Sequence, residues 1–437
     1  MGIFLCILAF VVTLIAARRS IIAGLVSLTT FGYFYGILRA NYPEAASHFI
    51  FDAAVLGFYI VHLFERQNAE TRRRSRAILP WLGLLIAWPV LLVFLPIQDP
   101  LVQLVGLRGN IFLLPFLLFG ARLTREEFQR LAMPISVLNV IAFMFTASEY
   151  VIGLEPFFPH NSNTTIMYHS ADVANAHFRI PSIFTGSHAY AGAMVMTMPL
   201  LIGAWAMPGI SAAKRLFILF SIVVSVLGIF AAASRVHIVV LGVVVLATLF
   251  SGRIRIQMRA IILAVVGMIA IVVLSEARLQ RISTLRDSDY LSQRVGSSVN
   301  AGFLDLLLEH PFGNGLGGGG TSLPFFLENR VRHRAIMENE YARIMLEQTC
   351  IGLCLWIAFI LWFILRKFSP LARIWDLTEE LSWVVVVAYF GTALIGIGLL
   401  TAIPQSMLFL LCAGSVTSWR VESYLETSEI PAEMAAT

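Results

Sequence analysis

Residues 216–251 read LFILFSIVVSVLGIFAAASRVHIVVLGVVVLATLFS, and Arg235 is the only charged side chain between two apolar runs. A helix needs about 20 apolar residues to cross the hydrocarbon core of a bilayer, so each run approaches the length of a membrane span. A helix also pairs its backbone polar groups within its own segment, as a lipid environment requires. This stretch therefore predicts two membrane helices that meet at Ser234 and Arg235.

The rest of the chain has the same apolar character. Of its 437 residues, 58% are hydrophobic and only 13% are charged, whereas an ordinary soluble domain carries about 25% charged residues. No strand-like alternation runs through the apolar stretches, which argues against an outer-membrane barrel. The predicted fold is all-α, a polytopic transmembrane bundle of about 12–13 spans with two long extracytoplasmic loops. The predicted spans lie near 2–17, 20–38, 49–64, 78–97, 101–121, 131–152, 190–208, 216–233, 236–251, 260–275, 341–365, 381–400 and 402–418.

Basic residues gather in alternate loops. Short cytoplasmic loops carry an excess of lysine and arginine, so these loops are predicted to face the cytoplasm of a bacterial inner membrane. Their basic residues are Arg18, Arg19, Arg66, Arg72, Arg73, Arg74, Arg76, Arg122, Arg125, Arg130, Lys214, Arg215, Arg253, Arg255, Arg259, Arg366, Lys367 and Arg373. The short loops on the other side carry almost none.

Two long loops remain, and both fall on the outer side. The predicted regions are N-terminal helices at 1–152, a first periplasmic loop at 153–189, central helices at 190–275, a second loop at 276–340 and C-terminal helices with a tail at 341–437. Loops of this length are usually functional. The second loop carries arginines that favour an anionic partner: Arg278, Arg281, Arg286, Arg294, Arg330, Arg332 and Arg334.

Four motifs follow one another across these loops. They are RIPSIFTGSHAYAG from Arg179, Ala233-Ser234-Arg235, RVGSSVNAGFLDLLLEHPFGNGLG from Arg294, and ENEYARIMLEQTCIG from Glu338. In this order they resemble the O-antigen ligase and O-antigen polymerase family of bacterial cell-envelope glycosyltransferases. Glu338 stands where the ligases often have histidine and polymerase-like members have an acid, which favours a polymerase.

The resemblance implies transfer of a glycan from a polyprenyl (undecaprenyl) diphosphate to an acceptor sugar hydroxyl. Arginine stays protonated and binds phosphate oxygens in bidentate fashion, so Arg235 and Arg294 are the predicted catalytic cations and Arg179 a third. Glu338 is the predicted base that removes the acceptor proton. The remaining predicted substrate-binding residues are His188, Asn339, Tyr341 and Arg334.

Several further expectations concern partners and cofactors. Neither a metal nor another cofactor is expected, because arginines can take the place of a divalent metal in stabilising the leaving diphosphate. The four cysteines are interpreted as small buried hydrophobes. The expected partners are the lipid-linked glycan, an acceptor glycan, membrane lipids and a chain-length regulator protein, and no nucleic acid.

Alternatives stand beside each of these interpretations. Arg235 could bind lipid headgroups from a helix end, Arg294 and Arg179 could form local contacts only, and Glu338 could cap a helix. The alternative functions are a ligase that loads lipid A core and, in another class, a transporter or flippase of lipid-linked sugars. A transporter predicts charged side chains at mid-membrane, for which Asp52 is the nearest example.

Overall fold

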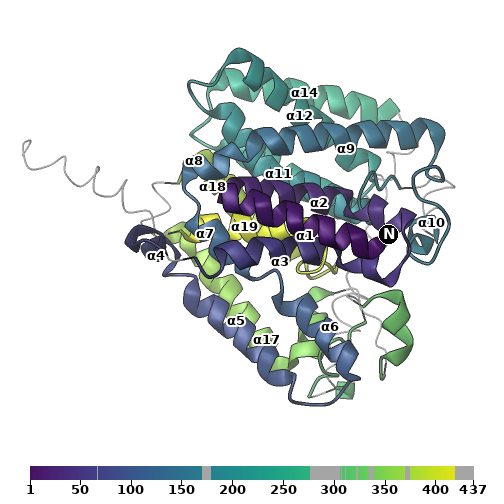
Figure 1. Ribbon diagram of the computed structural model, residues 1–437. Coiled ribbons are helices and arrows are strands. Elements are labelled where there is room, and N and C mark those ends of the chain that lie inside the picture. The colour runs from purple at the N-terminus through teal and green to yellow at the C-terminus, as the bar shows by residue number, and fades with distance from the viewer. Residues whose placement is uncertain are drawn as a thin grey trace, which may run out of the picture.

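The computed structural model describes residues 1–65, 67–169, 179–275, 306, 308–310, 312–320, 323–333, 339–369 and 375–418. These residues form helices and connecting segments, and no strand occurs among them. Figure 1 shows the helices packed side by side as a bundle. The predicted all-α class is therefore confirmed.

The helices in chain order are α1 (Gly2–Arg19), α2 (Ile21–Asn41), η1 (Ala45–Phe49), α3 (Ile50–His62), α4 (Ala69–Ser75), α5 (Leu79–Leu92), α6 (Pro100–Ile111), α7 (Pro115–Arg122), α8 (Arg125–Arg130), α9 (Ala132–Ile152), α10 (Thr165–His169), α11 (Ser187–Ala206), α12 (Ala212–Ala231), α13 (Arg235–Phe250), α14 (Ile256–Ser275), η5 (Phe325–Arg330), α17 (Glu340–Leu365), η6 (Arg366–Phe368), α18 (Leu377–Thr392) and α19 (Gln405–Thr417). Each predicted apolar stretch corresponds to one of these helices, except 101–121, which holds both α6 and α7.

The protein is a multi-pass membrane protein, but fewer helices reach a full span than the sequence predicts. Within the described residues, eight helical segments are long and apolar enough to cross a membrane, or nine if the bent pair α4 and α5 counts as one span. Two of the other helices, α13 and α18, have 16 residues each, and α19 has 13. At 1.5 Å per residue, α19 extends only about 20 Å, against a hydrocarbon core of about 30 Å. Hydropathy alone therefore overestimates the number of full spans.

The short helix α19 lies inside the protein. All of its residues are buried. It packs on α7 through two glycines: a Cβ atom on Gly120 would lie 2.2 Å from the carbonyl oxygen of Leu411, and one on Gly414 would lie 2.2 Å from that of Leu117. Small residues let membrane helices approach this closely. Because neighbouring helices cover α19, its length does not have to match the bilayer.

A polar cluster joins the centre of the bundle. The side chain of Asn139 in α9 accepts a hydrogen bond from the Tyr33 hydroxyl at 2.6 Å and donates to Thr197 at 3.0 Å and to Ser225 at 2.8 Å. These contacts connect α9 with α2, α11 and α12. Asn139 is fully buried, and its partners satisfy the polar groups that would otherwise cost free energy in an apolar interior.

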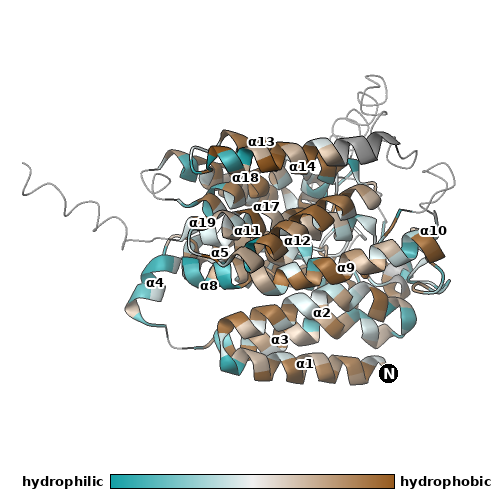
Figure 2. Cartoon of the chain, turned by 90° about the horizontal axis from the view of Figure 1, so that it is seen from above, coloured by the Kyte–Doolittle hydropathy of each residue, from teal (hydrophilic) through white to brown (hydrophobic). Residues whose placement is uncertain are grey.

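The predicted basic loops meet at one end of the bundle. Glu379 near the start of α18 pairs with Arg125 at 2.7 Å, and Glu380 pairs with Arg253 at 3.3 Å and with Lys367 at 3.1 Å. We call this end the basic face. Figure 2 shows mainly hydrophilic residues in α4 and α8 at the end remote from the N-terminus. The assignment of this face to the cytoplasm stays a prediction.

The other end, called the opposite face, holds the N-terminus and the ends of several helices. The Met1 amino group lies 3.2 Å from Glu44, just after α2. The first residues of α11 and α17 also lie at this end, as does the loop that follows α9 (Figure 1). The start of α13 lies beside the start of α11, because Ser234 contacts His188.

Candidate functional site

Two of the sequence motifs meet at the opposite face. Nη1 of Arg179 lies 3.2 Å from Nε2 of His188, the second residue of α11. Nδ1 of His188 lies 3.1 Å from Oγ of Ser234, which directly precedes α13. The structure therefore brings Arg179 and His188 together with the Ser234-Arg235 turn.

The donors and acceptors along this row of contacts, from Arg179 through His188 to Ser234, can be assigned. A guanidinium can only donate, so the neutral imidazole of His188 accepts at Nε2 and carries its proton on Nδ1. His188 then donates to Oγ of Ser234, and the Ser234 hydroxyl donates to Nδ1 of His237 at 2.6 Å. Ser234 and His237 are both buried. This order fixes the orientation of the His188 ring relative to Arg179.

The turn between α12 and α13 places Arg235 at the first position of a helix, which is an unfavourable position for a cation. Ala233 has a positive φ of 50°, which costs of the order of 1–3 kcal/mol in a residue other than glycine. Arg235 is the first residue of α13. A helix N-terminus carries partial positive charge and disfavours a cation. Helix stability therefore does not explain the arginine at this position.

A buried acid holds the segment that leads from Arg179 to α11. Ser182, with a φ of 54°, donates its backbone N–H to Oε2 of Glu149 at 2.9 Å and its hydroxyl to the carbonyl of Ala142 at 2.7 Å. Glu149 lies in the last turn of α9 and is 3% exposed. Glu149 is not among the site residues predicted from the sequence, although an acid inside an apolar span is itself a signal.

The same segment packs directly on α2. The backbone N–H of Ile37 donates to the carbonyl of Ile183 at 3.0 Å. A Cβ atom on Gly36 would lie 1.9 Å from the carbonyl carbon of Phe184. Only glycine leaves room for the backbone at this point. Residues 180–186 are thus fixed between α2 and α9.

The predicted residues at the start of α17 have structural contacts. Asn339 caps the helix by accepting from the backbone N–H groups of Tyr341 at 2.8 Å and Ala342 at 3.3 Å. The Tyr341 hydroxyl donates to the carbonyl of Phe390 at 2.7 Å. Their predicted contacts with substrate stay predictions. Glu338, Arg294 and Arg334 lie outside the described residues.

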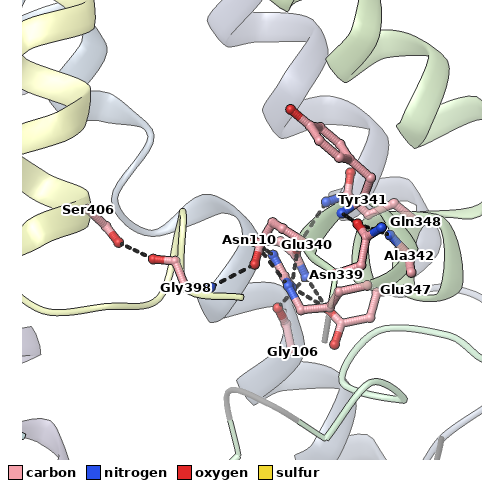
Figure 3. Close-up of polar contacts among 11 residues, drawn as sticks. Gly106, Asn110, Asn339, Glu340, Tyr341, Ala342, Glu347, Gln348, Gly398 and Ser406 are labelled. Atoms are coloured by element: carbon pink, nitrogen blue, oxygen red, sulfur yellow. Dashed lines mark hydrogen bonds and ion pairs between the residues drawn. The ribbon is translucent and has the colours of Figure 1, made fainter. Parts of the chain in front are cut away.

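A buried charged network follows within α17 (Figure 3). Arg343 donates to Glu340 at 2.7 Å and to Glu347 at 2.7 Å, and all three side chains have 0% exposure. Asn110 of α6 donates to Glu347 at 2.7 Å and accepts from Arg343 at 3.1 Å. Gln348 donates to Asn110 at 2.8 Å. The network ties the start of α17 to α6.

Two features place this network at an irregular part of the membrane region. Glu340 also accepts from the backbone N–H of Gly398, in the segment between α18 and α19. The helix α17 is broken at Thr349, where φ is 64° and ψ is 177°. The Trp88 indole donates to the carbonyl of Gln348 at 2.7 Å, at the break. Residues 340–349 therefore combine buried charge with an interrupted helix.

The glycine run at 313–320 packs between α6 and α17. A Cβ atom on Gly106 would lie 2.1 Å from the backbone nitrogen of Gly317. The backbone N–H of Asn314 donates to the carbonyl of Leu346 at 2.7 Å. The glycines thus allow the backbones of this run and of α6 to approach closely.

A cavity with a volume of about 240 Å³ opens beside this region. Arg108 lies in its wall and forms a two-point ion pair with Asp52, with Nε and Nη2 each 2.7 Å from a carboxylate oxygen. Arg39, in the last turn of α2, lies in the same wall. Asp52 is conspicuous in the sequence, but neither arginine is among the residues predicted from it. Arg108 inside an apolar stretch and Arg39 on the side poor in basic residues were the available signals.

The described residues contain no group of three or more His, Cys, Asp or Glu side chains that could hold a metal ion. No protein-family model matches the sequence, and no curated protein matches it significantly.

Proposed function

We propose that this protein is an inner-membrane glycosyltransferase that polymerises oligosaccharide units carried on polyprenyl diphosphate. The observation that supports it most is the pair of contacts that runs from Arg179 to His188 and from His188 to Ser234, next to Arg235. These residues come from two motifs that resemble the O-antigen polymerase and ligase family, and they lie at the face opposite to the basic loops.

The chemistry suits a cationic site next to lipid. The acceptor hydroxyl oxygen forms a bond to the anomeric carbon, and the bond from that carbon to the diphosphate oxygen breaks. Polyprenyl diphosphate leaves with the electron pair, and the acceptor proton passes to the Glu338 carboxylate. Arg179 and Arg235, with Arg294, balance the charge that develops on the leaving oxygens, which is usually the largest catalytic contribution. A single displacement of this kind inverts the anomeric configuration.

In this proposal, His188 and Ser234 are positioning residues. Because His188 accepts from Arg179 at Nε2 and is held by Ser234 at Nδ1, it limits where the guanidinium can point. An arginine that is already held in position does not have to reorient when charge develops on the leaving diphosphate oxygens.

The test is reconstitution of the full chain in liposomes with a polyprenyl-diphosphate oligosaccharide, with EDTA present. We expect a ladder of longer glycans. Arg235→Ala, Arg294→Ala and Glu338→Gln should each remove the ladder while the protein level is unchanged. Full activity of all three variants would contradict the proposal. Transfer only after lipid A core is added would identify a ligase.

One observation favours a transporter of lipid-linked sugars as the second candidate. Glu340, Arg343 and Glu347 are fully buried within one apolar helix that is broken two residues further on. Buried charges and interrupted helices are typical of transporter binding sites. Passage of the intact donor across a sealed vesicle, without glycan growth, would support this candidate.

A further inference from the structure

The cavity of about 240 Å³ is built by separate parts of the chain at the opposite face. Its walls come from the end of α2, from η1 and the start of α3, and from α6. Residues 162–163 of the first long loop, 323–324 of the second, and 400, 401 and 403 before α19 complete it. Segments far apart in the sequence thus enclose one space, and Thr185 brings the segment between Arg179 and His188 into its wall.

The charged side chains of the wall leave an excess positive charge. Asp52 is paired with Arg108, and it occupies two of the five donor hydrogens of that guanidinium. The remaining donors of Arg108 are held in a fixed orientation. Arg39 forms no ion pair in the part of the chain that the structure describes. Two guanidinium groups and one carboxylate give a net charge of about +1, with His48 neutral.

The rest of the lining contains polar, aromatic and aliphatic groups. Hydroxyl and amide side chains come from Ser162, Asn163, Thr185 and Thr401, in three different segments. The aromatic part of the wall consists of Tyr35, Phe49, Phe51 and Phe112. A pyranose ring has the matching surface, because its C–H faces are apolar and its rim carries hydroxyl groups. A volume just below the roughly 300–1,000 Å³ of drug-sized ligand sites suits one sugar ring.

We propose that this cavity binds a single sugar residue that carries one carboxylate, such as a hexuronic acid. Arg39 and the free edge of Arg108 would hold the carboxylate, since guanidinium and carboxylate pair in bidentate fashion. The hydroxyl and amide side chains would receive the ring hydroxyls. One anionic group balances the excess charge of the wall, whereas a diphosphate exceeds it.

This inference rests on the proposed function for its biological meaning, since the acidic sugar would be one unit of the glycan that is extended. The binding itself does not depend on transfer. A phospholipid headgroup offers a similar anion, so the experiment must separate a soluble sugar acid from an anionic lipid.

The test is equilibrium binding of radiolabelled methyl glucuronide to the full chain in nanodiscs of phosphatidylcholine. We expect saturable binding that methyl glucoside does not compete away. Arg39→Met should weaken it by about tenfold or more, because a charge-assisted contact is lost. Arg39→Lys should retain part of the affinity. Arg18→Met is the matched control, since Arg18 also lies in the last turn of its helix, but is exposed at the basic face.

Three outcomes would overturn the proposal. The first is that methyl glucuronide binds no better than methyl glucoside. The second is that Arg39→Met binds as the wild type does. The third is that nanodiscs containing phosphatidylglycerol abolish glucuronide binding while Arg39→Met restores it, because a lipid headgroup would then be the occupant. Loss of transfer activity with intact glucuronide binding would count against the proposed function alone.

Discussion

Oγ of Ser234 lies 3.1 Å from Nδ1 of His188, although the two residues are 46 positions apart in the sequence. This contact joins the first residues of α11 to the turn before α13. It also orients the imidazole whose other nitrogen faces Arg179. Ser234 therefore helps to position Arg179, through the ring of His188.

The Ser234→Ala variant tests this role. Without the hydroxyl, the Nδ1–H group of His188 loses the oxygen that accepts its hydrogen bond. The imidazole is then free to turn, and Arg179 loses its fixed position. We expect glycan elongation in liposomes to fall about tenfold to a hundredfold, as for other small misplacements of reacting groups. The effect should appear in kcat. The free energy of unfolding should fall as well, by about 1–3 kcal/mol, because Nδ1 of the buried His237 also loses its partner. Ser148→Ala, which changes a partly exposed serine of α9, should leave elongation unchanged, and equal rates for the two variants would contradict the role.

The Gly106→Ala variant tests the packing of the glycine run on α6. A Cβ atom at this position would lie 2.1 Å from the backbone of Gly317. We expect the free energy of unfolding to fall by about 1–3 kcal/mol, or more if the loop is displaced. Thermal unfolding of the purified protein in detergent measures this change.

Gly83→Ala is the matched control, since nothing lies within 4 Å of a Cβ atom there. Because alanine is the better helix former by about 1 kcal/mol, this variant should be as stable as the wild type or more stable. Equal stability losses in Gly106→Ala and Gly83→Ala would show that the glycine run does not pack as described.

The Arg343→Met variant tests the buried network of α17. It leaves two carboxylates, Glu340 and Glu347, without their cation in a dry interior. We expect a loss of about 3–5 kcal/mol in the free energy of unfolding. Adding Glu340→Gln and Glu347→Gln to the variant should recover much of this loss, because no unpaired charge then remains buried. A triple variant less stable than Arg343→Met would contradict the ion-pair account.

The sidedness of the bundle is testable by cysteine labelling. In a background without the four native cysteines, Ala69→Cys marks the basic face and Glu155→Cys marks the loop after α9; both residues are exposed. A membrane-impermeant maleimide added to spheroplasts should label Glu155→Cys, and label Ala69→Cys only after permeabilisation. The reverse pattern would invert the predicted topology.

The sequence predicts the helices well, because an apolar run has few alternatives to helix in a bilayer. It predicts the number of full spans less well. The helix α19 is as apolar as a helix that faces lipid, because it too is shielded from water. Its neighbours, however, are other helices of the protein. Hydropathy does not distinguish burial in protein from burial in lipid.

The candidate site was predictable where its residues belong to a motif, as Arg179, His188 and Arg235 do. It was not predictable where a contact depends on packing between distant helices. Asp52 and Arg108 are 56 positions apart, and Glu149 and Ser182 are 33 apart. Each of these charged residues was conspicuous within an apolar stretch, but its partner becomes known only from the fold.

The fate of the donor lipid distinguishes glycan transfer from transport of the intact donor. The wild-type chain is reconstituted in sealed liposomes with a polyprenyl-diphosphate oligosaccharide labelled in both lipid and glycan, with EDTA present. We expect that one polyprenyl diphosphate is released for each new glycosidic bond, and that the new bond has inverted anomeric configuration. Recovery of the donor intact in the other leaflet, with no free polyprenyl diphosphate, would contradict it.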